Sequence, residues 1–440
     1  LAKSLVKAYI EGFQQGSEGI GKESVVTVVK HFAGAGPQKD GLDAHNPWGK
    51  EQIYPGGQFA YHLVPFEGAF EARVAAVMPY YAMPLGLTQD GQPVEEVGFG
   101  FNRQIITDLL RGHFKFDGVV LSDWGIVNDC DSRCEQGLTQ DEVNAGVSPW
   151  TVPFGMSWGV EKLTKAERYA KAIDAGVDQF GGVEDPAPLL AAVQSGLVTE
   201  AAITTSAERI LAQKFALGLF ENPYVDAEAA VALVGKAEFQ QEAQAAQAAS
   251  HVLLKNEGAL LPLKADGKRV YLHNVNAEVA RANGYTVVTN LADAELAIVR
   301  VNAPGEQDPR FPFGSIHFGQ LGFASNDQVV QETAHEGVYR GADDYAAIQA
   351  IEQAGVPLVL SVYLDRPAIL TEVAPAARVL LANFGALDQA LFDVMSGTQK
   401  ARGKLPFELP SSWQAVLAQS PDVAKDSQSP LYPYGAGLAY

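Results

Sequence analysis

The side chain that points most directly to chemistry is Asp123, which follows the apolar run Val119–Leu121 and stands between Ser122 and Trp124. A short apolar run of this kind predicts a buried strand in a parallel sheet. In α/β barrels and open parallel sheets, the carboxyl end of a strand is where reactions take place. Asp123 is therefore a candidate catalytic carboxylate, although the same side chain could instead cap the segment that follows it.

Other strand ends carry chemical groups as well. The β-branched run Val25–Val29 leads into Lys30 and His31, and a long loop rich in glycine and aspartate then carries Asp43 and His45. A charged pair at the end of a strand usually faces a cleft, but Lys30 and His31 could also form a structural ion pair with a loop carboxylate. The loop acids and His45 are explained better by a polar turn than by a metal site, so we expect no metal and no other cofactor.

Composition restricts the partners of the chain. The formal charge is −20, from 32 basic and 52 acidic residues. Such an acidic chain is repelled by phosphate backbones and anionic lipid, which argues against nucleic acid and membrane partners. Cys130 and Cys134 are spaced for a local disulfide, with two reduced thiols as the alternative. A disulfide would fit an oxidising compartment, so we expect a periplasmic or secreted protein whose signal peptide is not in this chain.

Strands alternate with helices along the whole chain, which predicts α/β folding in two domains. We expect a first domain over 1–222, a linker and helix over 223–248 and a second domain over 249–440. The first domain has predicted strands at 25–29, 75–78, 119–121 and 177–180. The second has predicted strands at 270–272, 296–301, 358–362 and 379–381.

Six short motifs occur in a fixed order along the chain: Lys30–Phe32, Ser122–Gly125, Gly176–Asp178, Val252–Asn256, Gly403–Pro406 and Tyr432–Gly435. Together they resemble family 3 of the glycoside hydrolases, the β-glucosidase and exo-β-glucanase group. The resemblance implies a (β/α)8-type (TIM) barrel followed by an α/β sandwich domain. It also implies that Asp123 is the nucleophile, that Lys30 and His31 bind sugar hydroxyls, and that Trp124 stacks on a sugar.

The chemistry of the residues agrees with this resemblance. A retaining glycosidase needs one carboxylate that attacks the anomeric carbon and a second acid that protonates the leaving oxygen. A lysine within reach of Asp123 would keep that carboxylate ionised. We also expect Met78 and Tyr80, at the end of the 75–78 strand, to contact substrate, with core packing as the alternative for Tyr80. The expected substrate is an oligosaccharide or aryl β-glucoside with a terminal β-D-glucosyl residue.

The acid/base has two candidates. In two-domain members of the family it is a glutamate after an apolar strand of the second domain, which here predicts Glu306, with a surface loop carboxylate as the alternative. The β-N-acetylhexosaminidase branch uses an Asp-x-His pair, and Asp43 and His45 have that form. The loop is longer than expected for that branch, so we expect Asp43 and His45 to lie near the sugar, with an acid/base role as the second hypothesis. A β-xylosidase activity also stays open.

The strand count departs from the family. A full barrel needs eight strands, and four are predicted here. We therefore expect the N-terminal half of the barrel to be absent from this chain. A separate N-terminal companion chain or a homodimer would then complete it, or the chain would be a shortened relative. A sugar-binding or assembly subunit without turnover is the hypothesis from a different class.

Overall fold

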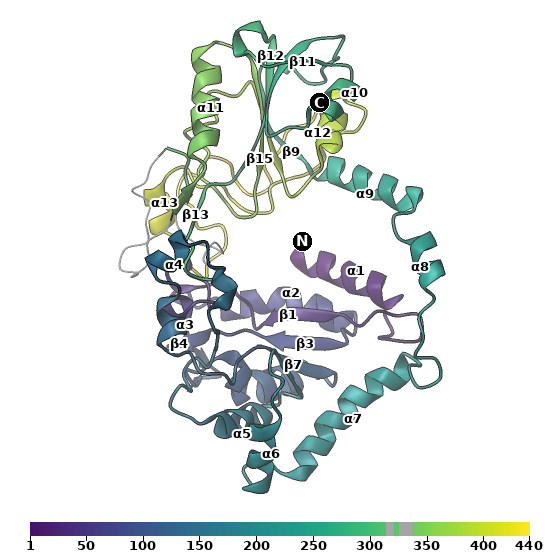
Figure 1. Ribbon diagram of the computed structural model, residues 1–440, viewed down its shortest axis with the longest axis vertical. Coiled ribbons are helices and arrows are strands. Elements are labelled where there is room, and N and C mark those ends of the chain that lie inside the picture. Colours follow the sequence, from purple (N-terminus) through teal and green to yellow (C-terminus); the bar gives the residue numbers. More distant parts are fainter. Residues whose placement is uncertain (314–320, 325–337) are drawn as a thin grey trace. The chain divides into compact units, whose positions relative to one another are not determined.

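The computed structural model describes residues 1–313, 321–324 and 338–440, which divide into two compact units. Unit 1 comprises Leu1–Val225, Asp308–Ile316 and Ser420–Val423, and unit 2 comprises the rest of the chain. Both combine helices with parallel strands (Figure 1). The predicted boundaries at 222 and 249 stay predictions, since two short segments from the second half of the chain belong to unit 1.

Unit 1 is built on a four-stranded parallel sheet in the order β1-β3-β7-β8. The register places Lys30 of β1 opposite Met78 of β3, and Val77 of β3 opposite Val120 of β7. Because the strands are parallel, their carboxyl ends share one edge, where Asp123 and His31 meet. The strands are β1 (Val28–Phe32), β3 (Ala76–Pro79), β7 (Val119–Trp124) and β8 (Gln179–Gly181).

Helices cover this sheet and bury its apolar side chains. Phe32, Val77 and Val120 are fully buried within one core cluster that includes residues from the covering helices. The helices of unit 1 are α1 (Ala2–Gln14), α2 (Phe59–Glu71), the π-helical segment Gln104–His113, α3 (Ser132–Gln136), α4 (Gln140–Asn144), α5 (Lys165–Ala175), α6 (Ala187–Gln194) and α7 (Glu200–Ala216). Short strands pair outside the main sheet: β2 (Glu51–Ile53) with β4 (Met83–Leu85), and β5 (Thr88–Gln89) with β6 (Gln92–Pro93).

The first strand begins later than its β-branched run suggests. Pairing with β3 starts at Val28 and continues to Phe32, so Lys30 and His31 lie inside β1 rather than after it. The residues before Val28 connect the strand to α1, where Val25 N–H donates to the Phe13 carbonyl. Local β-propensity does not decide where a strand starts, because the partner strand determines the pairing.

Unit 2 contains a six-stranded sheet in the order β11-β10-β12-β15-β16-β9, in which β9 is antiparallel to β16 and the other pairs are parallel. Apolar clusters cover both faces of the sheet. The strands are β9 (Val252–Asn256), β10 (Arg269–His273), β11 (Thr286–Val288), β12 (Leu296–Asn302), β15 (Leu358–Tyr363) and β16 (Val379–Asn383). The helices are α8 (Ala227–Leu233), α9 (Ala237–Ser250), α10 (Ala277–Ala282), α11 (Ala342–Gln353), α12 (Asp388–Ser396) and α13 (Trp413–Leu417).

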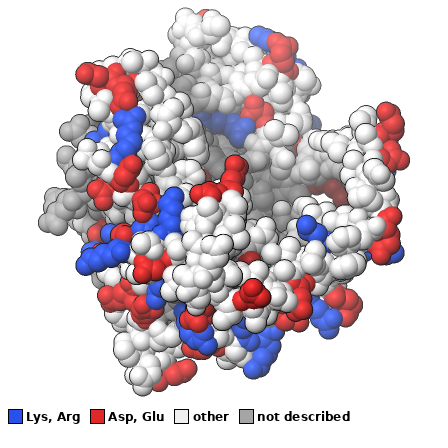
Figure 2. All heavy atoms as spheres, turned by 60° about the horizontal axis from the view of Figure 1, so that its bottom comes forward, with Lys and Arg blue, Asp and Glu red and all other residues white. Residues whose placement is uncertain are grey.

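The structure contains the two expected α/β regions, a parallel sheet with covering helices in unit 1 and a separate six-stranded sheet in unit 2. Cys130 and Cys134 form the predicted local disulfide. Among the described residues, no helix is both long and apolar enough to cross a membrane. On the face shown in Figure 2, acidic and basic side chains of the described residues are interspersed.

Candidate functional site

Asp123 lies at the carboxyl end of β7 and is 7% exposed. Its Oδ1 accepts a hydrogen bond from the Trp124 N–H at 2.8 Å, and its Oδ2 lies 3.2 Å from Nε2 of His31. Burial by itself raises the pKa of Asp123. The contacts with His31, Trp124 and Tyr81 outweigh burial and hold that pKa below its ordinary value. Asp123 is therefore a largely buried carboxylate that stays ionised, as a nucleophile requires.

Local contacts explain how β7 presents Asp123 and Trp124. The Ser122 hydroxyl accepts from the Gly181 N–H at 3.0 Å and donates to the Asp123 carbonyl at 2.8 Å, which ties the end of β7 to β8. A Cβ at Gly181 would lie 2.6 Å from the Trp124 ring, and one at Gly182 would lie 2.5 Å from it. Both glycines are therefore required for the indole to lie against this backbone, where it stays 46% exposed.

A cluster of rings surrounds the Asp123–His31 contact. The His31 ring centroid lies 5.3 Å from that of Tyr80 and 6.2 Å from that of His45. His45 Nδ1 is bonded to Asp43 Oδ1, and the His45 N–H donates to the same oxygen at 2.8 Å. The structure thus brings the predicted residues Asp43, His45, His31 and Tyr80 to the Asp123 end of the sheet.

Lys30 departs from the expectation that a lysine keeps Asp123 ionised. The basic group at Asp123 is His31, and Lys30 is exposed and lines an apolar groove between α1 and β1. The pairing of β1 with β3 is irregular between Lys30 and Phe32, so simple alternation along the strand does not indicate which of the two residues faces Asp123. A role of Lys30 in binding sugar hydroxyls stays a prediction.

Met78 and Tyr80 are more buried than residues that simply line an open cleft. Met78 is 5% exposed within β3, and Tyr80 is 2% exposed. The Tyr80 hydroxyl is bonded to the Gln38 side chain and lies 3.4 Å from the Ala44 N–H, so it supports the loop that carries Asp43 and His45. Their contacts with substrate stay predictions.

Sequence reasoning missed Trp158, which fixes that same loop. Its indole Nε1–H donates to the Ala44 carbonyl at 3.0 Å, and the side chain is 2% exposed. Arg168, also 2% exposed, fixes two nearby segments of the same unit. Its guanidinium donates to the carbonyls of Val127, Val160 and Glu161. A tryptophan in a long loop was the available signal, but its partner lies 114 residues away and could not be read from the pattern.

Glu306, the first-choice acid/base, belongs to unit 2. It lies on β13 (Gly305–Gln307), which pairs with β14 (Val338–Arg340), and it is 6% exposed. Glu306 is therefore a buried strand residue rather than a carboxylate of a surface loop. Its catalytic role stays a prediction.

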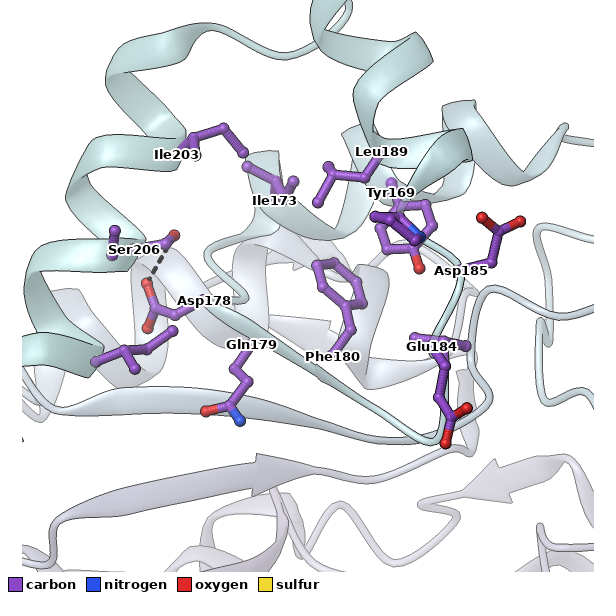
Figure 3. A pocket seen from close by; sticks show the side chains of 14 residues that line it. Tyr169, Ile173, Asp178, Gln179, Phe180, Glu184, Asp185, Leu189, Ile203 and Ser206 are labelled. Carbon is purple, nitrogen blue, oxygen red and sulfur yellow. Dashed lines mark hydrogen bonds between the residues drawn. The ribbon is translucent and has the colours of Figure 1, made fainter. Parts of the chain in front are cut away.

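A pocket of about 340 Å3 at β8 is a different feature from the Asp123 cluster. Figure 3 shows Asp178 pointing toward Ser206 of α7, beside Phe180 and Tyr169. The Asp178 carboxylate also accepts from Arg111 and Arg209, so it serves as a structural anchor. Among the residues that the structure describes, no group of three or more acidic, histidine or cysteine side chains is arranged to hold a metal ion.

Comparison with known proteins places this arrangement in a family. The profile of the "Glycosyl hydrolase family 3 N terminal domain" matches residues 1–213, and that of the "Glycosyl hydrolase family 3 C-terminal domain" matches residues 251–440. The chain belongs to glycosyl hydrolase family 3. Because the N-terminal profile matches unit 1, the family comparison gives no support to the expectation that half of the barrel is missing.

Several relatives match over the full length of this family 3 chain. A "Periplasmic beta-glucosidase/beta-xylosidase" of Dickeya chrysanthemi is 46% identical over 443 residues, covering 100% of this chain and 64% of the relative. "Beta-glucosidase C" of Emericella nidulans is 38% identical, covering 100% of this chain and 65% of the relative. The chain thus spans less than two thirds of the length of these relatives.

Solved structures of the family share the fold. A beta-glucosidase from Listeria innocua aligns with a TM-score of 0.71 at 20% identity, covering 99% of this chain and 62% of that one. An exo-1,3/1,4-beta-glucanase from a Pseudoalteromonas species aligns with a TM-score of 0.69 at 20% identity, covering 100% of this chain and 69% of that one. At this level of identity the likeness establishes the fold, and the expected class, a barrel-type α/β region followed by an α/β sandwich, is confirmed.

Proposed function

We propose that this protein is a retaining, exo-acting β-glycosidase that removes terminal non-reducing β-D-glucosyl residues, with Asp123 as the nucleophile. The observation that carries the proposal is the buried Asp123 carboxylate at the carboxyl end of a parallel strand, which contacts with His31, Trp124 and Tyr81 keep ionised. The names of the relatives, beta-glucosidase and beta-glucosidase/beta-xylosidase, support a β-glucoside substrate and leave a β-xyloside as the second candidate.

The reaction follows from two acids and a water molecule. An oxygen of Asp123 would attack the anomeric carbon while the bond to the leaving oxygen breaks and an acid protonates that oxygen. The product of this step is a glycosyl ester on Asp123. The same acid, now deprotonated, would then take a proton from water as the water attacks the anomeric carbon and releases Asp123. Trp124, half-exposed beside Asp123, would offer an aromatic face to the sugar.

Glu306 remains the first candidate for the acid, and a specific contact supports the second candidate. His45 is hydrogen-bonded to Asp43, and the His45 ring lies next to the ring of His31. An Asp-His pair therefore lies beside the nucleophile. Such a carboxylate orients the imidazole through its hydrogen bond to Nδ1. If the protein is instead a β-N-acetylhexosaminidase, the Asp43–His45 pair is the proposed acid/base.

Leaving-group dependence separates the two acids. Loss of the true acid/base should slow substrates with poor leaving groups strongly and spare the first step for those with good ones. We expect Glu306→Gln to show this pattern in kcat/KM across a series of substituted phenyl β-glucosides, with His45→Gln affecting all of them alike. The reverse result would identify the Asp43–His45 pair as the acid/base.

A fluorinated sugar tests the nucleophile directly. A 2-deoxy-2-fluoro β-glucosyl fluoride should label Asp123 covalently, and the mass of the labelled peptide should locate the sugar on that residue. Asp123→Asn should neither accept the label nor hydrolyse 4-nitrophenyl β-glucoside, while Asp174→Asn on the exposed surface should do both. Labelling at another residue would refute the assignment, and absence of both labelling and hydrolysis would favour a sugar-binding or assembly subunit.

We also propose that the β1 edge of the sheet pairs with a further strand, from a companion chain or from a second copy. Among the described residues, β1 pairs with β3 alone, and the groove beside it has a volume of about 550 Å3. Leu5, Tyr9 and Val28 line this groove and are more than a third exposed. Exposed sheet edges of this kind recruit other strands. Intact mass and sedimentation velocity would detect a companion chain or a dimer, and a monomer at every concentration would refute the proposal.

The periplasmic relative and the disulfide support a location in the periplasm or outside the cell. Fractionation of the producing cells, with the thiol state measured by alkylation, tests this location. Protein found in the cytoplasm with both cysteines alkylated would contradict it.

A further inference from the structure

A continuous row of aromatic rings leads away from the nucleophile, and its outer members have no role in the chemistry described above. His31 contacts Asp123, and the His45 ring follows it. The Phe313 ring lies 4.7 Å from His45, and the Trp150 ring lies 5.2 Å from Phe313. The row joins three segments of unit 1 that are far apart in the sequence.

The row becomes more exposed as it leaves Asp123. Asp123 is 7% exposed, Phe313 is partly buried, and Trp150 is 63% exposed. An exo-acting enzyme keeps the terminal sugar at the buried end, so the leaving group must extend toward the exposed end. Aromatic faces bind the apolar faces of sugar rings, and indole provides the largest such face.

The segment that carries Phe313 is anchored, so the ring has a fixed position. Phe311 is 4% exposed and packs edge-on against Trp48, with ring centroids 4.4 Å apart. The Arg310 carbonyl accepts from the Leu138 N–H at 3.0 Å, and the Phe313 carbonyl accepts from the Asn46 side chain at 3.4 Å. These contacts hold Phe313 over His45 rather than in solvent.

From this row we infer that Trp150, supported by Phe313, binds the leaving-group side of an oligosaccharide substrate and selects for glucosides longer than one ring. The inference rests on the proposed function, since it assigns the leaving-group side of the same site. It concerns specificity and gives Trp150 no part in bond breaking, because three ring contacts separate it from Asp123.

Substrate length provides the test. We expect Trp150→Ala to lower kcat/KM for a β-linked glucotriose about fivefold to tenfold, in line with the energy of one aromatic contact. Hydrolysis of methyl β-glucoside should change less than twofold, and Trp150→Phe should recover most of the loss. Tyr61→Ala removes another exposed ring of unit 1, which lies on α2, and should leave both substrates unchanged.

Binding without turnover separates this inference from the proposed function. A glucotriose with sulfur in place of the glycosidic oxygens should bind the unaltered chain about fivefold to tenfold more tightly than it binds Trp150→Ala. If this difference is found without hydrolysis of any glucoside, the proposed function fails and the binding role stands. If glucosides are hydrolysed and Trp150→Ala affects both substrate lengths equally, or neither, the inference is overturned.

Discussion

At the residue scale, His31 is one of the contacts that keep the buried Asp123 carboxylate ionised. Burial favours the neutral acid, and the contact with His31 is among those that reverse this preference, so the pKa of Asp123 lies below its ordinary value. In His31→Gln the lowering by charge is lost while burial remains, so the pKa of Asp123 should rise. Because attack requires the carboxylate, the acid limb of the kcat/KM profile should move to higher pH.

His113 provides the control for this pH profile, because it is exposed and belongs to the π-helical segment rather than to the Asp123 cluster. His113→Gln should leave the acid limb in place. An unchanged acid limb in His31→Gln would mean that His31 does not determine the ionisation of Asp123. The lowered pKa of Asp123 also makes folding depend on pH. The ionised carboxylate stabilises the native state at neutral pH, and that contribution is lost as the pH falls through the lowered pKa.

The residues themselves show what could be predicted from the sequence. Asp123 was recognisable because an apolar run, an acid and an indole are adjacent in the sequence, and residues adjacent in the sequence stay close in the folded protein. The basic partner of Asp123 was assigned to a lysine, because Lys30 and His31 are adjacent in the sequence and the sequence does not show which of them contacts the carboxylate. Phe313 and Trp158 were missed because their partners, His45 and Ala44, are more than 100 residues away.

At the element scale, Asp178 joins three elements of unit 1. Its carboxylate accepts from Arg111 at 2.6 Å, from the Val120 N–H of β7 at 2.8 Å and from Arg209 of α7 at 2.7 Å, with a side chain that is 1% exposed. Asp178→Ala would leave two cations and a strand N–H without this acceptor. We expect a loss of about 3–5 kcal/mol in the free energy of unfolding, measured in urea.

Asp174 is the matched control for Asp178. It also pairs with an arginine, Arg103, but its side chain is 72% exposed. Solvent screens such a pair, so Asp174→Ala should change the free energy of unfolding by less than about 1 kcal/mol. Equal losses in the two variants would contradict the view that α7 is fixed to the sheet through Asp178.

The disulfide is a second determinant at this scale, because it closes a short loop after β7. Cys130 and Cys134 are four residues apart, and Cys134 is 5% exposed. A loop this short should contribute about 2 kcal/mol through the entropy of the unfolded chain. We expect Cys130→Ser with Cys134→Ser to lower the free energy of unfolding by that amount. Reductant should not change the free energy of unfolding of the double variant. A decrease in that free energy would show that the reductant acts on something other than this disulfide.

At the scale of the whole molecule, the two α/β regions were predictable from the alternation of strands and helices, but the way the chain is shared between them was not. The segments 308–316 and 420–423 belong to unit 1, although they lie within the second half of the chain. Asp422 shows the reason: its carboxylate accepts from the N–H groups of Gly56 and Gln58 at 2.8 and 2.7 Å. No local pattern around Asp422 indicates these partners.

Separate apolar cores lead to a last prediction, that the two units unfold in two steps. The core of unit 1 and the two clusters of unit 2 share no residue. Four of the five tryptophans, Trp48, Trp124, Trp150 and Trp158, lie in unit 1, so fluorescence should report mainly on that unit while circular dichroism reports on both. Asp178→Ala should shift the fluorescence transition to lower urea. Leu360→Ala, at a fully buried position of β15, should lower the free energy of unfolding of unit 2 by about 2–5 kcal/mol and move only the transition of that unit. Coincident transitions that both variants move together would show instead that the units unfold as one cooperative body.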